Sequence, residues 1–208
     1  MRLVNFASVD PYHQDRGIGG LPGGKKQVEP IWEEFVDNKE ELLYESEKVL
    51  AERESDSIDN KFSEVLIGIE NLVGESKIQE VKVRVNQNVF RQIVLANYSG
   101  KCAITGIDIP EILVASHIVP WSKNAKERLN PENGICFSTM YDKAFDIGLI
   151  GLSTKYSVTV SSKLKRNIDK PYYEQYFAHL ENKIISLPQK YYPNKGFIEL
   201  HMDTIFQK

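Results

Sequence analysis

The chain has very few cysteines and no long apolar segment. Only two of its 208 residues are cysteines, Cys102 and Cys136. A four-cysteine zinc site needs more thiolates than these, and we expect no structural zinc. Because both cysteines stand among apolar neighbours, we expect them to be small buried hydrophobic residues. No apolar run approaches the roughly 20 residues that a membrane-spanning helix requires.

The N-terminus also lacks the charged-then-apolar layout of a secretory signal peptide. Its first fifteen residues read MRLVNFASVDPYHQD, and the apolar content of the whole chain, 41%, is ordinary for a globular protein. A chain of this length is expected to form one domain, or one domain with a helical annex. The simplest interpretation is a cytoplasmic protein with no membrane segment.

Excess positive charge is lacking as well, because the formal net charge is −3. That average hides a strong asymmetry, since residues 29–75 hold 15 acidic and 4 basic side chains. The segments on either side are net basic, and phosphate binding needs only a local basic face. The acidic block is expected to face solvent, to face a partner, or to screen nonspecific DNA, and the sequence leaves these three possibilities open.

The N-terminal third is predicted to be an irregular arm followed by helices. Residues 1–28 are rich in turn-forming Gly and Pro pairs, which favour irregular structure. Pro30 suits the first position of a helix, and the helical spacing of apolar residues then continues to Leu50, with a break near Asp37-Asn38. The polar stretch 55–60, SDSIDN, is the candidate linker.

A new pattern begins at Val81. Valine alternates with polar residues over 81–85, which predicts a short strand, and Asn86 is a plausible N-cap for a helix that ends at Gly100. We therefore divide the chain into residues 1–76, an N-terminal arm with an acidic helical region, and residues 77–208, a second domain. A hairpin is expected after residue 148, and two short helices after residue 170.

The most informative stretch runs from Val114 to Gly148 and reads VASHIVPWSKNAKERLNPENGICFSTMYDKAFDIG. A short apolar strand leads to Ser116 and His117, and a polar loop follows. Asn133-Gly134 opens a second apolar run, which continues into a helical segment carrying Asp142. Together with the preceding CAITG, this order of strand with His, loop with Asn, strand, and helix with a polar ligand resembles the HNH nuclease family.

The resemblance implies an α+β fold, in which a ββα-metal (HNH) finger is embedded in a mixed domain with an N-terminal helical annex. It implies that His117 is the general base, and that Asn133 bridges backbone groups across the loop. Asp142 then corresponds to a metal ligand on the helix. The implied cofactor is Mg²⁺ or another divalent ion such as Mn²⁺.

One position departs from the family pattern. The residue before the catalytic His is often a metal-binding Asp or His, and here it is Ser116. A neutral hydroxyl is a poorer ligand for Mg²⁺ than a carboxylate. Either Ser116 contributes through water, or Asp142 and the DNA phosphate hold most of the ion.

The resemblance also implies double-stranded DNA as the substrate. Residues near the finger that suit phosphate contacts are Arg84, Gln87, Arg91, Lys123 and Arg128. Positive and polar side chains on a helix are also what a solvated surface presents, so for the helical residues both interpretations remain open.

The leading hypothesis is a metal-dependent DNA endonuclease of restriction or phage-defence type. One finger cuts one strand, so cleavage of a duplex requires a homodimer or sequential nicking. The first alternative is a catalytically inactive DNA-binding module with the HNH fold, which Ser116 motivates. The second is an interaction protein whose acidic helices recruit a partner.

Overall fold

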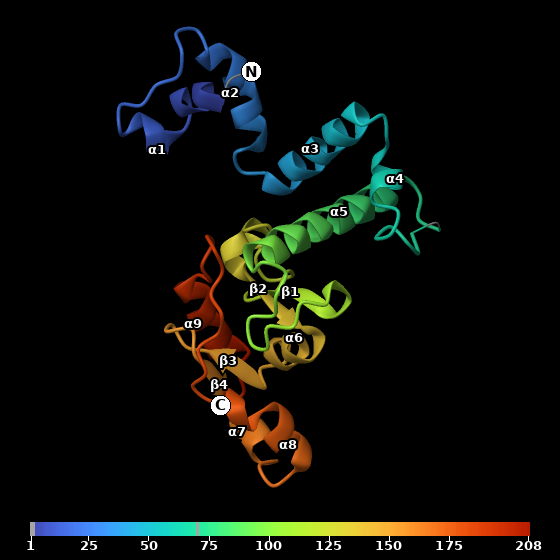
Figure 1. Cartoon of the computed structure of the whole chain (residues 1–208). Coiled ribbons are helices and arrows are strands. Elements are labelled where there is room, and N and C mark those ends of the chain that lie inside the picture. The colour runs from blue at the N-terminus through green and yellow to red at the C-terminus, as the bar shows by residue number, and fades with distance from the viewer. Residues whose placement is uncertain (1–2, 70) are drawn as a thin grey trace. The chain divides into compact units, whose positions relative to one another are not determined.

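The computed structural model describes residues 3–69 and 71–208, which form two compact units (Figure 1). One unit ends at Asn86, and the other runs from Gln87 to Lys208. The boundary expected between residues 76 and 77 falls inside one continuous helix, α5 (Gly74–Asn97). Helices and two antiparallel β-hairpins confirm the predicted α+β class. Across the described ranges, no helix has the length and apolar content to cross a bilayer.

The first unit is helical. Its elements are η1 (Leu3–Ser8), α1 (Pro11–Gln14), α2 (Lys25–Phe35), α3 (Lys39–Arg53), α4 (Ile58–Lys61) and the first part of α5. The predicted break near Asp37-Asn38 is confirmed, because the Asn38 side chain caps α3 by accepting from the Glu41 amide at 3.3 Å.

Two predictions for this unit are wrong. The first 28 residues are not irregular throughout, since they contain η1, α1 and the start of α2. Pro30 lies inside α2 rather than at its first position. The helix begins at Lys25, which forms an i,i+4 ion pair with Glu29 at 3.4 Å. A proline in the sixth position removes one backbone hydrogen bond, and α2 continues past it.

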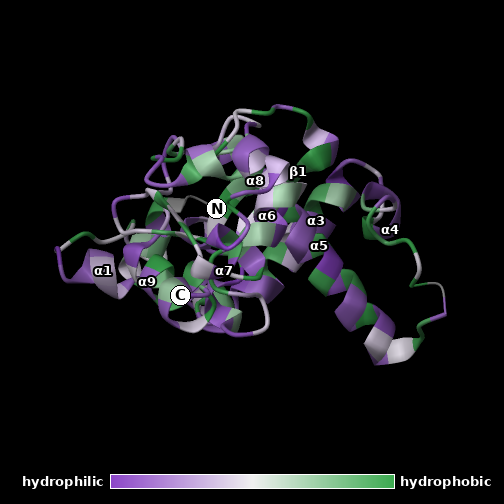
Figure 2. Cartoon of the chain, turned by 90° about the horizontal axis from the view of Figure 1, so that it is seen from below, coloured by the Kyte–Doolittle hydropathy of each residue, from purple (hydrophilic) through white to green (hydrophobic). Residues whose placement is uncertain are grey.

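The strand predicted over residues 81–85 is also wrong, because this segment is helical and belongs to α5. Val81, Val85 and Val89 are buried. Their spacing of four residues places them on one face of a helix, and the intervening valine made the pattern look like strand alternation. Figure 2 shows hydrophilic and hydrophobic segments alternating along α5, as in an amphipathic helix. Asn86 is therefore not an N-cap.

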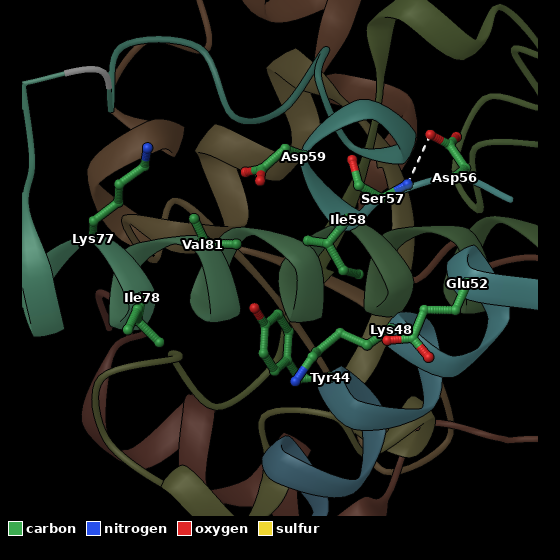
Figure 3. A pocket seen from close by; sticks show the side chains of 10 residues that line it. All are labelled: Tyr44, Lys48, Glu52, Asp56, Ser57, Ile58, Asp59, Lys77, Ile78 and Val81. Atoms are coloured by element: carbon green, nitrogen blue, oxygen red, sulfur yellow. Dashed lines mark hydrogen bonds between the residues drawn. The ribbon is translucent and has the colours of Figure 1, made fainter.

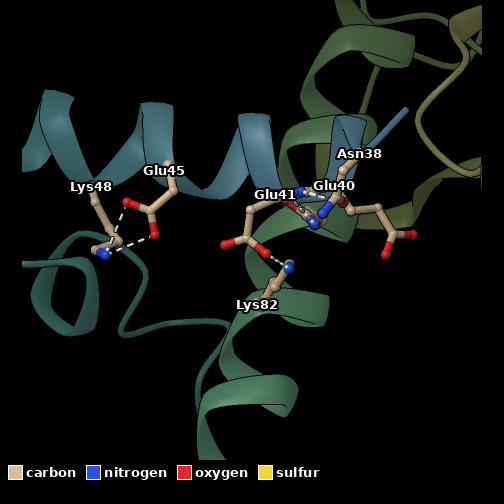
Figure 4. Close-up of polar contacts among 7 residues, drawn as sticks. Asn38, Glu40, Glu41, Glu45, Lys48 and Lys82 are labelled. Atoms are coloured by element: carbon tan, nitrogen blue, oxygen red, sulfur yellow. Dashed lines mark hydrogen bonds and ion pairs between the residues drawn. The ribbon is translucent and has the colours of Figure 1, made fainter. Parts of the chain in front are cut away.

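The helices of this unit enclose a pocket of about 370 Å³ (Figure 3). Tyr44 and Lys48 reach it from α3, and Ile78 and Val81 from α5. Polar contacts join the same helices, and Figure 4 shows Glu41 of α3 turned towards Lys82 of α5. The Asn86 amide also donates to the Glu40 carbonyl, at 3.1 Å.

The second unit contains the segment singled out in the sequence. Strands β1 (Leu113–His117) and β2 (Gly134–Ser138) pair antiparallel, with Ser116 opposite Ile135. Helix α6 (Thr139–Asp146) follows β2 directly. The remaining elements are η2 (Pro110–Ile112), η3 (Ala125–Glu127), η4 (Pro131–Asn133), β3 (Ile150–Leu152), β4 (Val158–Val160), α7 (Ser162–Lys165), α8 (Pro171–Tyr176), η5 (Ala178–Leu180) and α9 (Lys195–Thr204). The predicted hairpin is β3–β4, and helices α8 and α9 occupy the tail as expected.

One apolar cluster holds the second unit together. Phe90 and Val94 of α5 pack in it with β2 and with Phe145 of α6. Gly134 marks the closest approach, because a Cβ there would lie 2.4 Å from Val94 Cγ2 and 2.9 Å from the Phe90 ring. The glycine therefore lets β2 press directly against α5. Both cysteines are free and buried, as the sequence predicted.

Candidate active site

Three contacts fix the imidazole of His117, at the end of β1. Its ring stacks on Phe90 of α5, with centroids 4.0 Å apart and planes at 16°. The Trp121 ring meets it edge-on at 5.4 Å. Its Nε2 lies 2.9 Å from the main-chain carbonyl oxygen of Arg128. The half-buried ring is thus held on one face, at its edge and by one of its two nitrogens.

The contact with Arg128 determines the tautomer of His117. A carbonyl oxygen only accepts hydrogen bonds, so Nε2 carries the proton and the neutral ring has its lone pair on Nδ1. Burial lowers the pKa of His117, and the hydrogen bond to the Arg128 carbonyl opposes that shift. The histidine is therefore favoured in the neutral form, which is the form that accepts a proton.

Asn133 organises the loop that follows His117. Its Oδ1 accepts from the Val119 amide at 2.8 Å, and its Nδ2 donates to the carbonyls of Val119 and Glu127, each at 3.1 Å. The residue is 1% exposed. The Ile118 amide in turn donates to the Asn133 carbonyl at 2.9 Å. Asn133 thus bridges backbone groups across the loop, in the arrangement that the sequence resemblance implied.

Ser116 and Asp142 come together from β1 and α6. Burial raises the pKa of the Asp142 carboxyl, and the neighbouring Ser116 hydroxyl and the Lys143 charge act against that rise. The pKa of the more exposed Asp146 is also raised, first by loss of solvation and then by the charge of Asp142 one turn away. A hydroxyl and a carboxylate therefore lie side by side near the end of β1, and a second carboxylate lies one turn further along α6.

No direct contact joins His117 to Asp142 in the described part of the chain. Ser116 lies beside Asp142 of α6 and His117 lies against Phe90 of α5, as expected for successive strand residues with opposite directions. The Cα atoms of Ser116 and His117 are nevertheless only about 3.8 Å apart, because the two residues are joined by a trans peptide bond. The imidazole and the carboxylates thus flank the last two residues of β1.

The donor set suits a hard divalent cation. The Ser116 hydroxyl is buried beside the Asp142 carboxyl, and its oxygen accepts no hydrogen bond within the described chain. Asp142 and Asp146 add carboxylate oxygens, which Mg²⁺ and Mn²⁺ prefer. No cluster of three or more His, Cys, Asp or Glu side chains occurs among the described residues. Sites with one or two carboxylates, completed by water and phosphate oxygens, are usual for Mg²⁺.

The predicted DNA-binding residues fall into two groups. Arg84 is paired with Glu80 and donates to the carbonyls of Val65 and Ile67. Arg91 donates to the carbonyls of Leu113 and Pro110, at 2.6 and 2.8 Å. These two guanidinium groups are therefore already engaged with the protein's own backbone.

The remaining candidates lie closer to solvent. Arg128 is partly engaged, because its Nε donates to the Trp121 carbonyl at 2.8 Å and its guanidinium lies over the Trp121 ring. Lys123 is exposed, and its ammonium group has no ion-pair partner in the described ranges. Gln87 is exposed on α5. Lys123 and Gln87 are thus the two most exposed of the five candidates, and the three arginines are only partly exposed.

Sequence reasoning missed two components of the site. Phe90 is a buried residue of α5, but nothing in the sequence connects it to His117, 27 positions later. The Arg128 carbonyl is a main-chain group, and every residue carries the same one, so its role has no sequence signal.

Residues 102–153 match the family model described as HNH endonuclease. This segment is an HNH endonuclease domain. The match includes β1, β2 and α6, and therefore Ser116, His117, Asn133 and Asp142. A comparison with curated proteins finds no match to the chain. The HNH domain implies nuclease activity on DNA, and the family generally uses a divalent metal ion.

Proposed function

We propose that the chain is a metal-dependent endonuclease that hydrolyses phosphodiester bonds in double-stranded DNA, with His117 as the general base. The observation that carries this proposal is the hydrogen bond from His117 Nε2 to the Arg128 carbonyl. It leaves Nδ1 as the proton acceptor, and contacts with Phe90 and Trp121 hold the ring in one orientation. A fixed neutral imidazole suits removal of a proton from an attacking water.

The other residues of the site have separate tasks. Asp142 and Ser116 are the proposed ligands of Mg²⁺ or Mn²⁺, and Asp146 adds negative charge one turn away. When bound, such an ion polarises a phosphate oxygen and stabilises the leaving 3′-oxygen. Asn133 holds the loop from Val119 to Glu127, and this keeps the Arg128 carbonyl in reach of His117.

Contacts with DNA are proposed for the exposed candidates. Lys123 lies in the loop after His117, and a single ammonium group there contacts one phosphate. Gln87 is a candidate hydrogen-bond donor on α5. Arg84, Arg91 and Arg128 have backbone partners, so their proposed contribution to DNA binding is the positive charge that they add.

The decisive experiment is nicking of supercoiled plasmid by the wild type and by His117→Ala, with Mg²⁺ or Mn²⁺ and with EDTA as the metal-free control. We expect metal-dependent nicking by the wild type and at least a hundredfold slower rate for the variant, in line with general-base catalysis. A wild type that binds DNA but never nicks it with Mg²⁺, Mn²⁺ or Ni²⁺ would instead identify an inactive DNA-binding module.

A restriction or phage-defence role in the cytoplasm is part of the proposal. It rests on the resemblance of residues 81–108, VKVRVNQNVFRQIVLANYSGKCAITGID, to the segment that precedes the finger in bacterial restriction-type HNH endonucleases. Cleavage of both strands then requires a homodimer or two successive nicks, because the described chain contains one HNH domain. Sedimentation velocity with and without a DNA duplex tests the homodimer. A linear product that forms without a nicked intermediate would support paired active sites.

A further inference from the structure

Helix α6 is contacted by α9, which follows the residues of the HNH match in the chain. His201 of α9 is 2% exposed, and its ring stacks on Phe145 with centroids 3.9 Å apart and planes at 5°. Its Nε2 donates to the Phe145 main-chain carbonyl at 3.1 Å. One side chain therefore contacts both the ring and the backbone of the residue that precedes Asp146.

Phe145 connects His201 to the strands. On its other side, the Phe145 ring meets Phe137 of β2 at 5.5 Å, with an interplanar angle of 62°. Strand β2 pairs in turn with β1, where Ile135 lies opposite Ser116. Each of the elements α9, α6, β2 and β1 contacts the next, so the position of α9 influences how α6 lies against Ser116.

The residues after α9 bind the end of α6 in the same way. The Gln207 amide donates to the Gly148 carbonyl at 3.0 Å, and its side chain donates to the Ile147 carbonyl at 2.6 Å. A Cβ on Gly148 would lie 2.1 Å from the Ile205 carbonyl oxygen. The backbone that follows α6 is thus in contact with the C-terminal segment.

An imidazole is a costly side chain for this position. Because Nε2 donates to a carbonyl, Nδ1 of the neutral ring is a buried acceptor, and it has no partner in the described chain. Burial lowers the pKa of His201 to about 4, so the ring is neutral near pH 7. A phenylalanine would stack on Phe145 equally well and would bury no unsatisfied nitrogen. The contact with Phe145 that depends on the imidazole, and that a phenylalanine could not make, is the hydrogen bond to its carbonyl.

Helix α9 packs on β3, and its residue His201 contacts Phe145 of α6. Between α9 and the loop after His117 lies a cavity of about 240 Å³, lined by Ile118, Val119, Pro120 and Lys123 on the loop side. His201 lines the same cavity from α9. His201 thus contacts α6 through Phe145 and also borders the cavity next to the loop after His117.

We propose that His201 is a positioning residue of the nuclease, which donates to the Phe145 carbonyl and so sets the orientation of Asp142 towards Ser116. This inference rests on the proposed function, because it assumes that Asp142 binds the divalent ion. A residue that supports a metal ligand from behind changes metal affinity when it is replaced, even where the fold survives.

The test compares His201→Phe, which keeps the ring stack and removes the donor, with His201→Gln, which keeps an N–H donor. His179→Phe is the matched control, since His179 is exposed in η5. Mn²⁺ affinity is measured by electron paramagnetic resonance without DNA, thermal unfolding by circular dichroism, and plasmid nicking at saturating Mn²⁺.

For His201→Phe we expect an unchanged or higher melting temperature, Mn²⁺ affinity lowered roughly tenfold, and slower nicking with an unchanged KM for DNA. His201→Gln should recover much of the lost affinity, and His179→Phe should match the wild type. Wild-type Mn²⁺ affinity in a folded His201→Phe protein would overturn the positioning role. Loss of nicking in His117→Ala supports the proposed function independently, so the two failures are distinguishable.

Discussion

Phe90 lies flat against His117, with the two ring centroids 4.0 Å apart and the planes at 16°. The phenylalanine comes from α5, before the HNH match begins, and the histidine ends the first strand of the domain. The helix that precedes the domain is thus part of its active site. Arg91, the next residue of α5, donates to the Leu113 carbonyl at the start of the same strand.

Replacing Phe90 by leucine should slow nicking by roughly tenfold, because the imidazole loses the flat surface that restricts its rotation. The substitution also removes buried ring atoms, and we expect the free energy of unfolding to fall by about 1–3 kcal/mol. Nicking rates are compared at a temperature where both proteins are fully folded. Phe177→Leu is the control, since Phe177 is buried away from His117. Equal losses of rate in both variants would show that packing, and not the stack, is responsible.

Asp142→Ala should abolish metal-dependent nicking while DNA binding stays equal or becomes slightly tighter, because a negative charge near the phosphate is removed. Gel-shift titration in EDTA measures DNA binding, and plasmid nicking with Mg²⁺ measures the reaction. Asp203→Ala, which removes an exposed carboxylate of α9, serves as the control. Full activity of Asp142→Ala would mean that the ion has other ligands.

Asn133→Ala should lower both stability and rate. Three hydrogen bonds of the buried side chain are lost, and their backbone partners are left without it, so unfolding should become easier by about 2–4 kcal/mol. Urea denaturation measures this change. Asn124→Ala removes only one local bond, to the Lys126 amide, and should cost about 1 kcal/mol or less. An inactive Asn133→Ala protein of wild-type stability would point to a direct catalytic role.

Gly148→Ala and Gly106→Ala separate backbone strain from steric contact. Both glycines have positive φ, +71° and +75°, so each alanine costs about 1 kcal/mol or more. Only at Gly148 would the new Cβ meet backbone, 2.1 Å from the Ile205 carbonyl oxygen, whereas Gly106 has nothing within 4 Å. Thermal unfolding should therefore show a clearly larger loss for Gly148→Ala. Equal losses would mean that the C-terminal segment moves aside freely.

Stability should fall between pH 6.5 and pH 4 because of His201. Its pKa is about 4 in the folded chain and about 6.5 in the unfolded chain, so only the unfolded state takes up the proton in this range. The free energy of unfolding should therefore decrease by about 3 kcal/mol as the pH is lowered from 7 to 4. Urea denaturation at several pH values measures this slope, and His201→Phe should lose that part of it. An identical slope in both proteins would assign it to other groups.

The order of strand, loop, strand and helix in the finger could be predicted because each element depends on residues that are close together in the sequence. Apolar residues before Ser116-His117 require a strand, and Asn133-Gly134 opens the second one. The helix that follows begins within a few residues, so Asp142, the proposed metal ligand, comes at a predictable distance. These periodicities also explain why the β3–β4 hairpin was predicted correctly. They failed at residues 81–85, where valines at i and i+4 lie on one helix face and the valine between them imitates a strand.

By itself, the sequence determined the α+β class, the ββα order, and the residue types that a histidine base and a divalent ion require. Only the tertiary structure decided that Phe90 packs on His117 and that the Arg128 carbonyl selects the tautomer of His117. It also decided that His201 of α9 contacts Phe145 of α6. Ring stacking and main-chain carbonyls leave no mark on local residue patterns, because they depend on which distant segments the core brings together.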